Sequence, residues 1–332
     1  HRRTSRPALA LRMLRHPARP RMHWAFHDER MARAVRERTS RHRYDLVQVE
    51  YSQMAQYRSL ISPTTPRVLV KHDVRAVMAW RALKTARGPN RALAFFEWLM
   101  MPPYELTTCQ QFDAVVTLSE HNRRLLQGFL PGLPVSVIPP GIDTAEEEPT
   151  RYERSGREVA FFGNMASWRN VGAVLFFYRE VFPLVQSAVP GARLHIIGAK
   201  PSGEIEALAR DNAVIVTGYV DDVRAYFSGC DVAIAPMQIG GGILMKVLEM
   251  MAVGLPVVAT PVANEGVDAD PDSEILLAND AKGFARQVVR LLHAGELRRR
   301  VGLGGQRFVG RRFDWMACID GWEALYKDCL LY

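Results

Sequence analysis

The sequence has 332 residues, about twice the length of a typical domain, so we expect two domains. Hydrophobic residues make up 48% of it and charged residues 23%, an ordinary globular composition that excludes a fibrous or largely disordered chain. Its apolar runs are short, and none approaches the roughly 20 residues that a membrane-spanning helix needs. The cysteines are widely scattered, which argues against a zinc cluster or disulfide scaffold and favours a reducing, cytoplasmic compartment: Cys109, Cys230, Cys318 and Cys329.

The net charge of +8 is concentrated at one end of the chain. Residues 1–43 hold thirteen arginines and three acidic residues, so the remainder is slightly acidic. Leu9, Leu11 and Leu14 lie among these arginines in a short amphipathic pattern, which favours contact with an anionic membrane surface. A solvated face in an arginine-rich protein is the plainer interpretation. A nucleic-acid partner is not expected, because no aromatic stacking platform accompanies the charge.

Short apolar runs alternate with helical patterns through the first half of the chain, which is typical of a parallel α/β fold. Their near-continuous valine, isoleucine and leucine content is what strands buried on both faces require. We expect strands at residues 45–50, 67–72, 113–118 and 135–139. Helices are expected around residues 23–41, 74–86, 92–110 and 119–129.

A turn-rich stretch at residues 139–149 separates the two halves and is the best domain boundary in the chain. After it the alternation restarts, with strands expected at 158–163, 193–198, 213–217, 231–235, 255–260 and 274–277. We therefore predict two Rossmann-like, doubly wound parallel-sheet domains that face a cleft, with ligands beyond the carboxyl ends of the strands. The predicted parts are an N-terminal domain at 1–143, a C-terminal domain at 144–312, and a helix at 313–332 that packs back towards the first domain.

The most informative segment is DVAIAPMQIGGGILMKVLE, residues 231–249. The triple glycine Gly240–Gly242 opens an expected helix over 242–253, so backbone N–H groups there can approach an anion such as a phosphate. Lys246 and Glu249 lie three residues apart on one helical face, where a cation can neutralise a diphosphate and a carboxylate can bind ribose hydroxyls. The alternative is a flexible loop beside an ordinary surface Lys–Glu pair.

The longer segment DVAIAPMQIGGGILMKVLEMMAVGLPVVATPVANEGV resembles the donor-site signature of GT-B-fold glycosyltransferases of the retaining family-4 type, the glycosyl transferases group 1. FFGNM at 161–165 is similar to the glycine loop that follows the first strand of that family's C-terminal domain. VTGYVDDV at 216–223 and VIPPGID at 137–143 resemble two further segments, in the family's order. The resemblance begins near Tyr44 and is strongest over 158–277.

The resemblance implies that the C-terminal domain binds a nucleotide-diphosphate sugar, without a cofactor or metal ion, and that the N-terminal domain presents the acceptor. A histidine after the RVLVKH strand contacts the donor sugar in the family, which makes His72 a candidate catalytic residue beside Lys246; a strand-end histidine bonded to backbone is the alternative. Asp73 and Glu265 are further candidate donor contacts, and Glu265 is alternatively a helix-start acid. The candidate residues for the nucleotide and its diphosphate are Gly163, Asn164, Gly240, Gly241, Gly242, Lys246 and Glu249.

The implied activity is sugar transfer to a glycan or lipid-linked acceptor in cell-surface polysaccharide synthesis, by a cytoplasmic protein peripheral to the membrane. Two departures from the family leave open a nucleotide-sugar-binding protein without transfer activity. Gly241 stands where the family commonly has a second glutamate. The strand, glycine-rich loop and helix that open the family's N-terminal domain are missing before Tyr44, so we expect that domain to be truncated. A dinucleotide-dependent oxidoreductase is disfavoured, because no GxGxxG motif opens either half.

Overall fold

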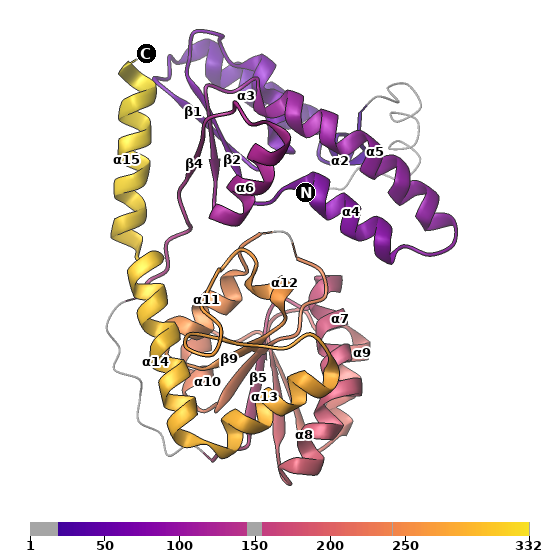
Figure 1. Cartoon of the computed structure of the whole chain (residues 1–332). Helices are drawn as coiled ribbons and strands as arrows, with labels where there is room; N and C mark the ends of the chain where they lie inside the picture. The colour runs from indigo at the N-terminus through magenta and orange to yellow at the C-terminus, as the bar shows by residue number, and fades with distance from the viewer. Residues whose placement is uncertain (1–18, 145–154, 241, 332) are drawn as a thin grey trace. The chain divides into compact units, whose positions relative to one another are not determined.

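The chain forms two compact units, each around its own parallel sheet (Figure 1). The first unit comprises His1–Pro139 together with Ile319–Tyr332, and the second comprises Pro140–Cys318. The predicted class, two Rossmann-like α/β domains, is confirmed. The structure, a computed structural model, describes residues 19–144, 155–240 and 242–331.

The first unit holds a four-stranded parallel sheet whose strands follow one another in chain order. Successive side chains of its second strand face opposite sides, as a pleated strand requires. Leu69 packs into an apolar cluster with Val115 and Leu126, whereas Val68 and Val70 pack into another cluster with Val116 and Ile138. The strands are β1 (Val47–Glu50), β2 (Arg67–Lys71), β3 (Ala114–Thr117) and β4 (Val135–Val137).

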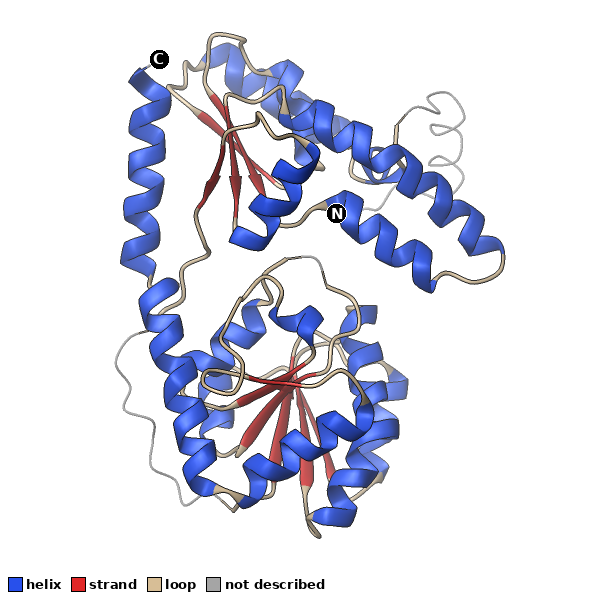
Figure 2. Cartoon of the chain, in the orientation of Figure 1, coloured by secondary structure: helices blue, strands red, loops and turns tan. Residues whose placement is uncertain are grey.

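Helices cover both faces of this sheet (Figure 2). The C-terminal helix supplies Trp322 and Leu325 to the Val68–Val70 face, and the hydroxyl of its Tyr326 contacts the Gln48 side-chain oxygen at 2.5 Å. The other elements are α2 (Arg21–Ala25), α3 (Glu29–Arg41), η1 (Met54–Leu60), α4 (Arg75–Thr85), α5 (Pro89–Cys109), α6 (Glu120–Phe129) and α15 (Trp315–Leu331). Over the described part of the chain, no helix is both long and apolar enough to cross a membrane.

A buried ion pair joins β2 to the helical hairpin α4–α5. The Lys71 ammonium is fully buried, forms a salt bridge with the Glu105 carboxylate and donates to the Ser52 hydroxyl at 2.9 Å. The same carboxylate accepts the backbone N–H groups of Arg75 and Ala76, both at 2.9 Å, and so caps the first turn of α4. Burial opposes the charge on Lys71, but the Glu105 carboxylate outweighs it, and the pKa of Lys71 is raised.

The second unit holds a six-stranded parallel sheet in the order β10-β9-β8-β5-β6-β7. The chain therefore builds outward from β5 through β6 and β7, then returns to the other side of β5 and continues through β8 to β10. The chain direction across the sheet thus reverses between β5 and β8. The strands are β5 (Glu158–Phe162), β6 (Arg193–Ile197), β7 (Val214–Gly218), β8 (Val232–Ala235), β9 (Val257–Ala259) and β10 (Leu276–Leu277).

The helices of this unit close over an apolar core in which Phe161, Phe177, Phe227 and Phe284 are fully buried. They are α7 (Trp168–Phe176), η2 (Phe177–Val181), α8 (Phe182–Ala188), α9 (Gly203–Glu206), η3 (Ala207–Arg210), α10 (Val223–Ser228), α11 (Met245–Ala252), α12 (Pro261–Asn264), α13 (Ala281–His293) and α14 (Gly295–Arg312).

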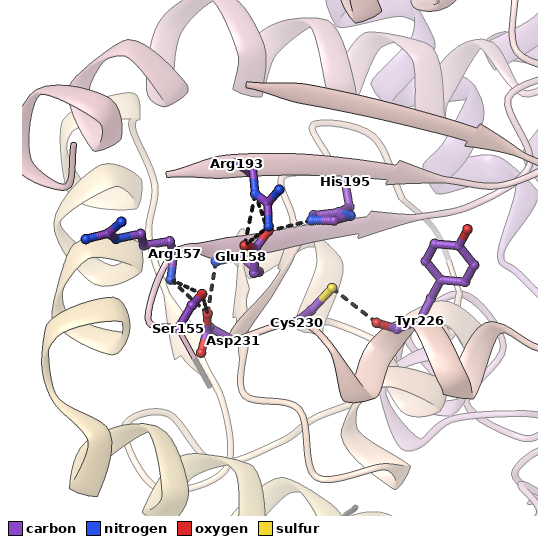
Figure 3. Close-up of polar contacts among 8 residues, drawn as sticks. All are labelled: Ser155, Arg157, Glu158, Arg193, His195, Tyr226, Cys230 and Asp231. Carbon is purple, nitrogen blue, oxygen red and sulfur yellow. Dashed lines mark hydrogen bonds and ion pairs between the residues drawn. The ribbon is translucent and has the colours of Figure 1, made fainter. Parts of the chain in front are cut away.

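Hydrogen bonds and an ion pair connect the amino ends of β5, β6 and β8 (Figure 3). The buried Asp231 carboxylate accepts the backbone N–H groups of Arg157 and Glu158 at 2.8 and 2.9 Å. Glu158 in turn accepts from His195 at 2.6 Å and pairs with Arg193. Burial alone raises the pKa of Glu158, but these two partners lower it overall. This cluster is structural, because it lies at the edge of the sheet opposite to the carboxyl ends.

The strands expected from sequence are present, and several element boundaries differ from the expected ones. The helix expected over 242–253 begins at Met245, so the residues after the glycines stay in the loop. Between β6 and β7 the chain forms two short helical segments, α9 and the 3₁₀ turn η3. The strand expected over 274–277 keeps only the last two residues, which pair with β9 at the edge of the sheet.

Removing the Glu105 carboxylate leaves the Lys71 charge buried without its counter-ion and uncaps α4. We expect Glu105→Ala to lower the free energy of unfolding by about 3–5 kcal/mol, measured by urea unfolding followed by circular dichroism. Glu323→Ala is the matched control, since Glu323 is exposed and pairs only with Lys327. A cost for Glu105→Ala no larger than for the control would contradict this role of the pair.

Candidate functional site

The candidate site lies in the second unit, at the carboxyl ends of β5 and β8. Doubly wound sheets bind ligands where the chain direction across the sheet reverses, because the loops after the two strands diverge there. The loop after β5 begins with Gly163, and the loop after β8 runs through Met237 and the glycines to α11. Both loops meet at Lys246, the second residue of α11.

The Lys246 ammonium is surrounded by residues of β5, α7 and the loop after β8. It donates to the Asn170 side-chain oxygen at 2.6 Å and lies 3.7 Å from the Met237 sulfur. It also sits 4.6 Å from the centre of the Phe161 ring, in a cation–π contact. Gly163 makes room for this arrangement, since a Cβ there would lie 2.7 Å from Asn170 Nδ2 and 2.9 Å from Lys246 Nζ.

The surroundings of Lys246 disfavour its charge. Burial and, to a smaller extent, the nearby Arg169 guanidinium lower the pKa of Lys246, Glu249 raises it, and the net result is a pKa of about 8. No carboxylate of the described residues hydrogen-bonds to this ammonium. An anion that entered the site would supply the missing counter-charge. Lys246 and Arg169 together therefore form a cationic position prepared for an anionic ligand.

Glu249 lies one turn beyond Lys246 and is half-buried. Burial raises the pKa of Glu249, while Arg224 and Lys246 hold it down. Arg224 itself donates to the Asp143 carbonyl oxygen at 3.0 Å. Glu249 is thus a partly desolvated carboxylate beside a cation, able to accept hydrogen bonds from hydroxyl groups.

The glycine loop before α11 packs closely on α12 and the residues after it. A Cβ on Gly240 would meet Val262 Cγ1 at 3.0 Å, and one on Gly266 would meet the Gly242 carbonyl at 2.7 Å. Glu265, a candidate donor contact, immediately precedes Gly266 and therefore lies beside this loop. Among the described residues no side chain caps the first turn of α11. The Val247 N–H donates to the Leu244 carbonyl at 2.8 Å, and a helix start without a side-chain cap suits an anion. Gly241 lies outside the described residues.

Two asparagines follow β5, and Asn164 was the candidate from sequence. Asn164 is exposed, and its side-chain oxygen accepts the Ala166 N–H at 2.9 Å within its own turn. Asn170 instead binds Lys246 and donates to the Asn164 carbonyl at 2.8 Å. Sequence reasoning missed Asn170. The available signal was a polar residue on the buried face of α7, where Ala173, Val174 and Phe177 follow at helical spacing.

The two other candidates belong to the first unit, at the carboxyl end of β2. His72 Nε2 lies 2.7 Å from the Glu50 carboxylate, and its ring stacks on Tyr51 with centroids 3.8 Å apart. Tyr51 adopts a left-handed backbone with φ of 67°, a conformation that costs energy in a non-glycine residue. The ring of His72 is thus held on two sides. Asp73 is paired with Arg75 at 2.8 Å.

No group of three or more histidine, cysteine or acidic side chains within residues 19–144, 155–240 and 242–331 is arranged to hold a metal ion. The acidic loop around Asp268 contains no such group, and the Asp268 carboxylate lies 3.3 Å from Arg312.

Residues 156–294 match the family described as glycosyl transferases group 1, and residues 2–146 match glycosyltransferase family 4. These matches include every strand of both sheets. The chain belongs to the group 1 glycosyltransferases.

Solved glycosyltransferase structures show the same GT-B fold. Sucrose-phosphate synthase of Thermosynechococcus elongatus superposes with a TM-score of 0.70 at 19% identity, over 90% of this chain and 77% of that one. HepE of Anabaena, solved with UDP and glucose, gives a TM-score of 0.65 at 14% identity, over 90% and 80%. The two-domain GT-B prediction is therefore confirmed.

Two curated relatives match part of the sequence. A protein of the cps region of Klebsiella pneumoniae is 26% identical over 147 residues, which is 42% of this chain and 38% of that protein. The glycosyltransferase MJ1069 of Methanocaldococcus jannaschii is 21% identical over 233 residues, 65% of this chain and 58% of that protein. The chain thus matches less than two thirds of the length of either relative.

The pKa of Lys246 has a consequence for stability. Because the folded value of about 8 lies below the ordinary 10.5, the folded protein binds fewer protons than the unfolded chain between these pH values, and stability rises with pH across that window. We expect Lys246→Met to stabilise the protein by about 2 kcal/mol at pH 7, with the gain lost above about pH 10. Urea unfolding at both pH values, with the exposed Lys282→Met as control, measures it. A loss of stability at pH 7 would contradict the buried, unneutralised charge.

Proposed function

We propose that this glycosyltransferase moves a sugar from a nucleotide-diphosphate donor to a glycan or lipid-linked acceptor, in cell-surface polysaccharide synthesis at the cytoplasmic face of the membrane. The donor assignment rests on Lys246, a half-buried cation with no hydrogen-bonded carboxylate among the described residues, beside a helix start without a side-chain cap and a glycine loop. The HepE structure with UDP and glucose and the relative from a cps region agree with it.

In this proposal the second unit binds the donor's diphosphate. Lys246 and the first N–H groups of α11 face its oxygens, while Gly163 allows the backbone of the loop after β5 to approach closely. Glu249 accepts hydrogen bonds from the ribose hydroxyls. When the bond between the anomeric carbon and the diphosphate breaks, negative charge grows on the leaving oxygen, and the preformed cation and dipoles stabilise it.

The first unit supplies the acceptor side and His72. We propose that the imidazole, oriented by Glu50 and Tyr51, donates to a hydroxyl of the donor sugar. Asp73 is less suited to act as a base, because its carboxylate is engaged by Arg75. Retention of configuration at the anomeric carbon is proposed from the resemblance to the retaining type.

The second candidate function is nucleotide-sugar binding without transfer. It is favoured by Gly241, which stands at the position of the family's second glutamate. The backbone of the glycine loop binds a diphosphate equally well in either case, so binding alone does not distinguish the two functions. Turnover of the donor does.

The donor site is tested by calorimetric titration of UDP, GDP and ADP. We expect one nucleoside diphosphate to bind, and Lys246→Ala to weaken it about ten- to hundredfold, because a charge-assisted hydrogen bond is lost. Lys282→Ala, at an exposed position of α13, is the control. Equal affinity of the wild type and Lys246→Ala for the nucleoside diphosphate would contradict the assignment of the diphosphate to this site.

Transfer is tested by release of the nucleoside diphosphate from a labelled donor in the presence of cell-envelope glycolipid. We expect His72→Ala to lower kcat at least a hundredfold with little change in the affinity for the free diphosphate. His293→Ala, on the exposed side of α13, is the control. Tight binding with no turnover by the wild-type protein would favour the binding function instead.

A further inference from the structure

The hairpin α4–α5 of the first unit exposes large apolar side chains. Trp80 on α4 is 41% exposed, and on α5 Phe95, Phe96 and Leu99 are 44%, 57% and 55% exposed. Residues three and four apart share a helix face, so Leu99 continues the surface of Phe95 and Phe96 by one turn. Such side chains in water are unfavourable at about 25 cal/mol for each Å² of apolar surface.

The aromatic rings form one continuous surface across the two helices. The ring centres of Trp80 and Trp98 are 5.3 Å apart, those of Trp98 and Phe95 are 5.9 Å apart, and those of Phe95 and Phe96 are 6.0 Å apart. The Lys84 ammonium lies 4.9 Å from the centre of the Trp80 ring. We call the residues Trp80, Phe95, Phe96, Trp98 and Leu99 the aromatic face.

The hairpin that carries the aromatic face also carries several positively charged residues. Arg81 and Lys84 on α4, Arg87 in the connection and Arg91 on the first turn of α5 lie within the same hairpin. The hairpin holds two acidic residues: Glu105, which pairs with Lys71, and Glu97, whose carboxylate accepts the N–H groups of Arg21 and Met22 at 2.8 and 3.3 Å. The hairpin is therefore strongly cationic.

The hairpin is also fixed in shape. Its inner side packs Ala76, Ala79 and Met101 into an apolar cluster, and the Glu105 carboxylate caps α4. The turn uses Gly88 at φ of 57° followed by Pro89 as the first residue of α5, a combination that suits a sharp entry into a helix. The two helices extend beyond the sheet of their unit, with the turn at their far end (Figure 1).

We propose that the aromatic face docks the protein on an anionic lipid bilayer. Tryptophan and phenylalanine rings partition into the interface between headgroups and acyl chains, and each arginine or lysine near an anionic surface adds attraction. A protein partner with an apolar patch would match the rings but not the positive charge of the hairpin, whereas an anionic bilayer matches both. The helices lie on the membrane and do not cross it.

This surface differs from the basic segment expected to meet the membrane from sequence. That expectation rested on residues 1–43, of which the first eighteen lie outside the described residues. The aromatic face belongs to α4 and α5, and it shares no residue with the site around Lys246. Its test is therefore independent of the proposed donor binding.

Flotation of the full chain with vesicles tests the proposal. We expect binding to vesicles of phosphatidylglycerol and phosphatidylcholine in equal parts, and much weaker binding to pure phosphatidylcholine. Phe96→Ser should lower the partition coefficient about tenfold, because a phenyl ring no longer enters the interface. Phe129→Ser is the matched control, since Phe129 is a 46% exposed phenylalanine of the same unit on α6. The far-ultraviolet circular dichroism spectrum and the melting temperature report whether Phe96→Ser is folded.

Charge reversal separates this surface from the basic segment. Arg87→Glu with Arg91→Glu should lower binding to anionic vesicles at least tenfold, whereas Arg33→Glu with Arg36→Glu on α3 should change it less. The reverse order would overturn the proposal and assign the membrane contact to the basic segment. Equal binding of Phe96→Ser and Phe129→Ser would overturn it as well. A third outcome would also overturn the proposal: neither protein binds vesicles, and light scattering shows that the wild type is a dimer and Phe96→Ser a monomer. The aromatic face would then join two copies of the chain.

Discussion

The candidate site depends on one constraint, the burial of the Lys246 ammonium without a carboxylate against it. The chain contains a contrasting case in Lys71, which is more deeply buried but pairs with Glu105 and has a raised pKa. Lys246 faces an amide oxygen, a thioether and an aromatic ring, and its pKa falls to about 8. The first arrangement is complete in itself, whereas the second is completed by an anion. This difference supports the proposal that Lys71 is a structural lysine and that Lys246 binds a ligand.

The sheet topology explains why the unsatisfied cation lies where it does. The loops after β5 and β8 diverge because the chain turns back across β5, and Gly163 and α11 meet in the gap between them. The polar cluster around Asp231 connects the opposite, amino ends of the same strands by hydrogen bonds and so stabilises the sheet there. The polar groups at the amino ends of the strands thus pair with one another, whereas we propose that the cation at the carboxyl ends pairs with a ligand.

Sequence reasoning recovered the parts of the fold that local patterns specify. Buried parallel strands are nearly continuous apolar runs, so β2, β5 and β8 could be found within one or two residues. Glycines and a lysine at fixed spacing pointed to α11. The partners of that lysine could not be found in this way, because Asn170 lies 76 residues from it and meets it only through the tertiary fold. The Lys71–Glu105 pair escaped notice for the same reason.

The aromatic face shows another limit of local patterns. A helix over residues 92–110 was expected, but the sequence did not indicate that Phe95, Phe96 and Leu99 are its exposed apolar residues. Their exposure follows from the way α4 packs on α5, where Ala76 and Ala79 turn inward and Trp80 remains outside. Which of several apolar positions on a helix is buried is decided by the neighbouring helix, and periodicity alone does not supply that neighbour.

The most direct test of the account is the pKa of Lys246 itself, measured by NMR of side-chain-labelled lysine with Lys246→Met to assign the signal. We expect the Lys246 ammonium to titrate near pH 8 in the free protein. Its pKa should rise clearly when the nucleoside diphosphate binds, because the diphosphate supplies the missing counter-charge. A lysine that titrates at the ordinary value, or one whose pKa does not change with saturating ligand, would contradict it.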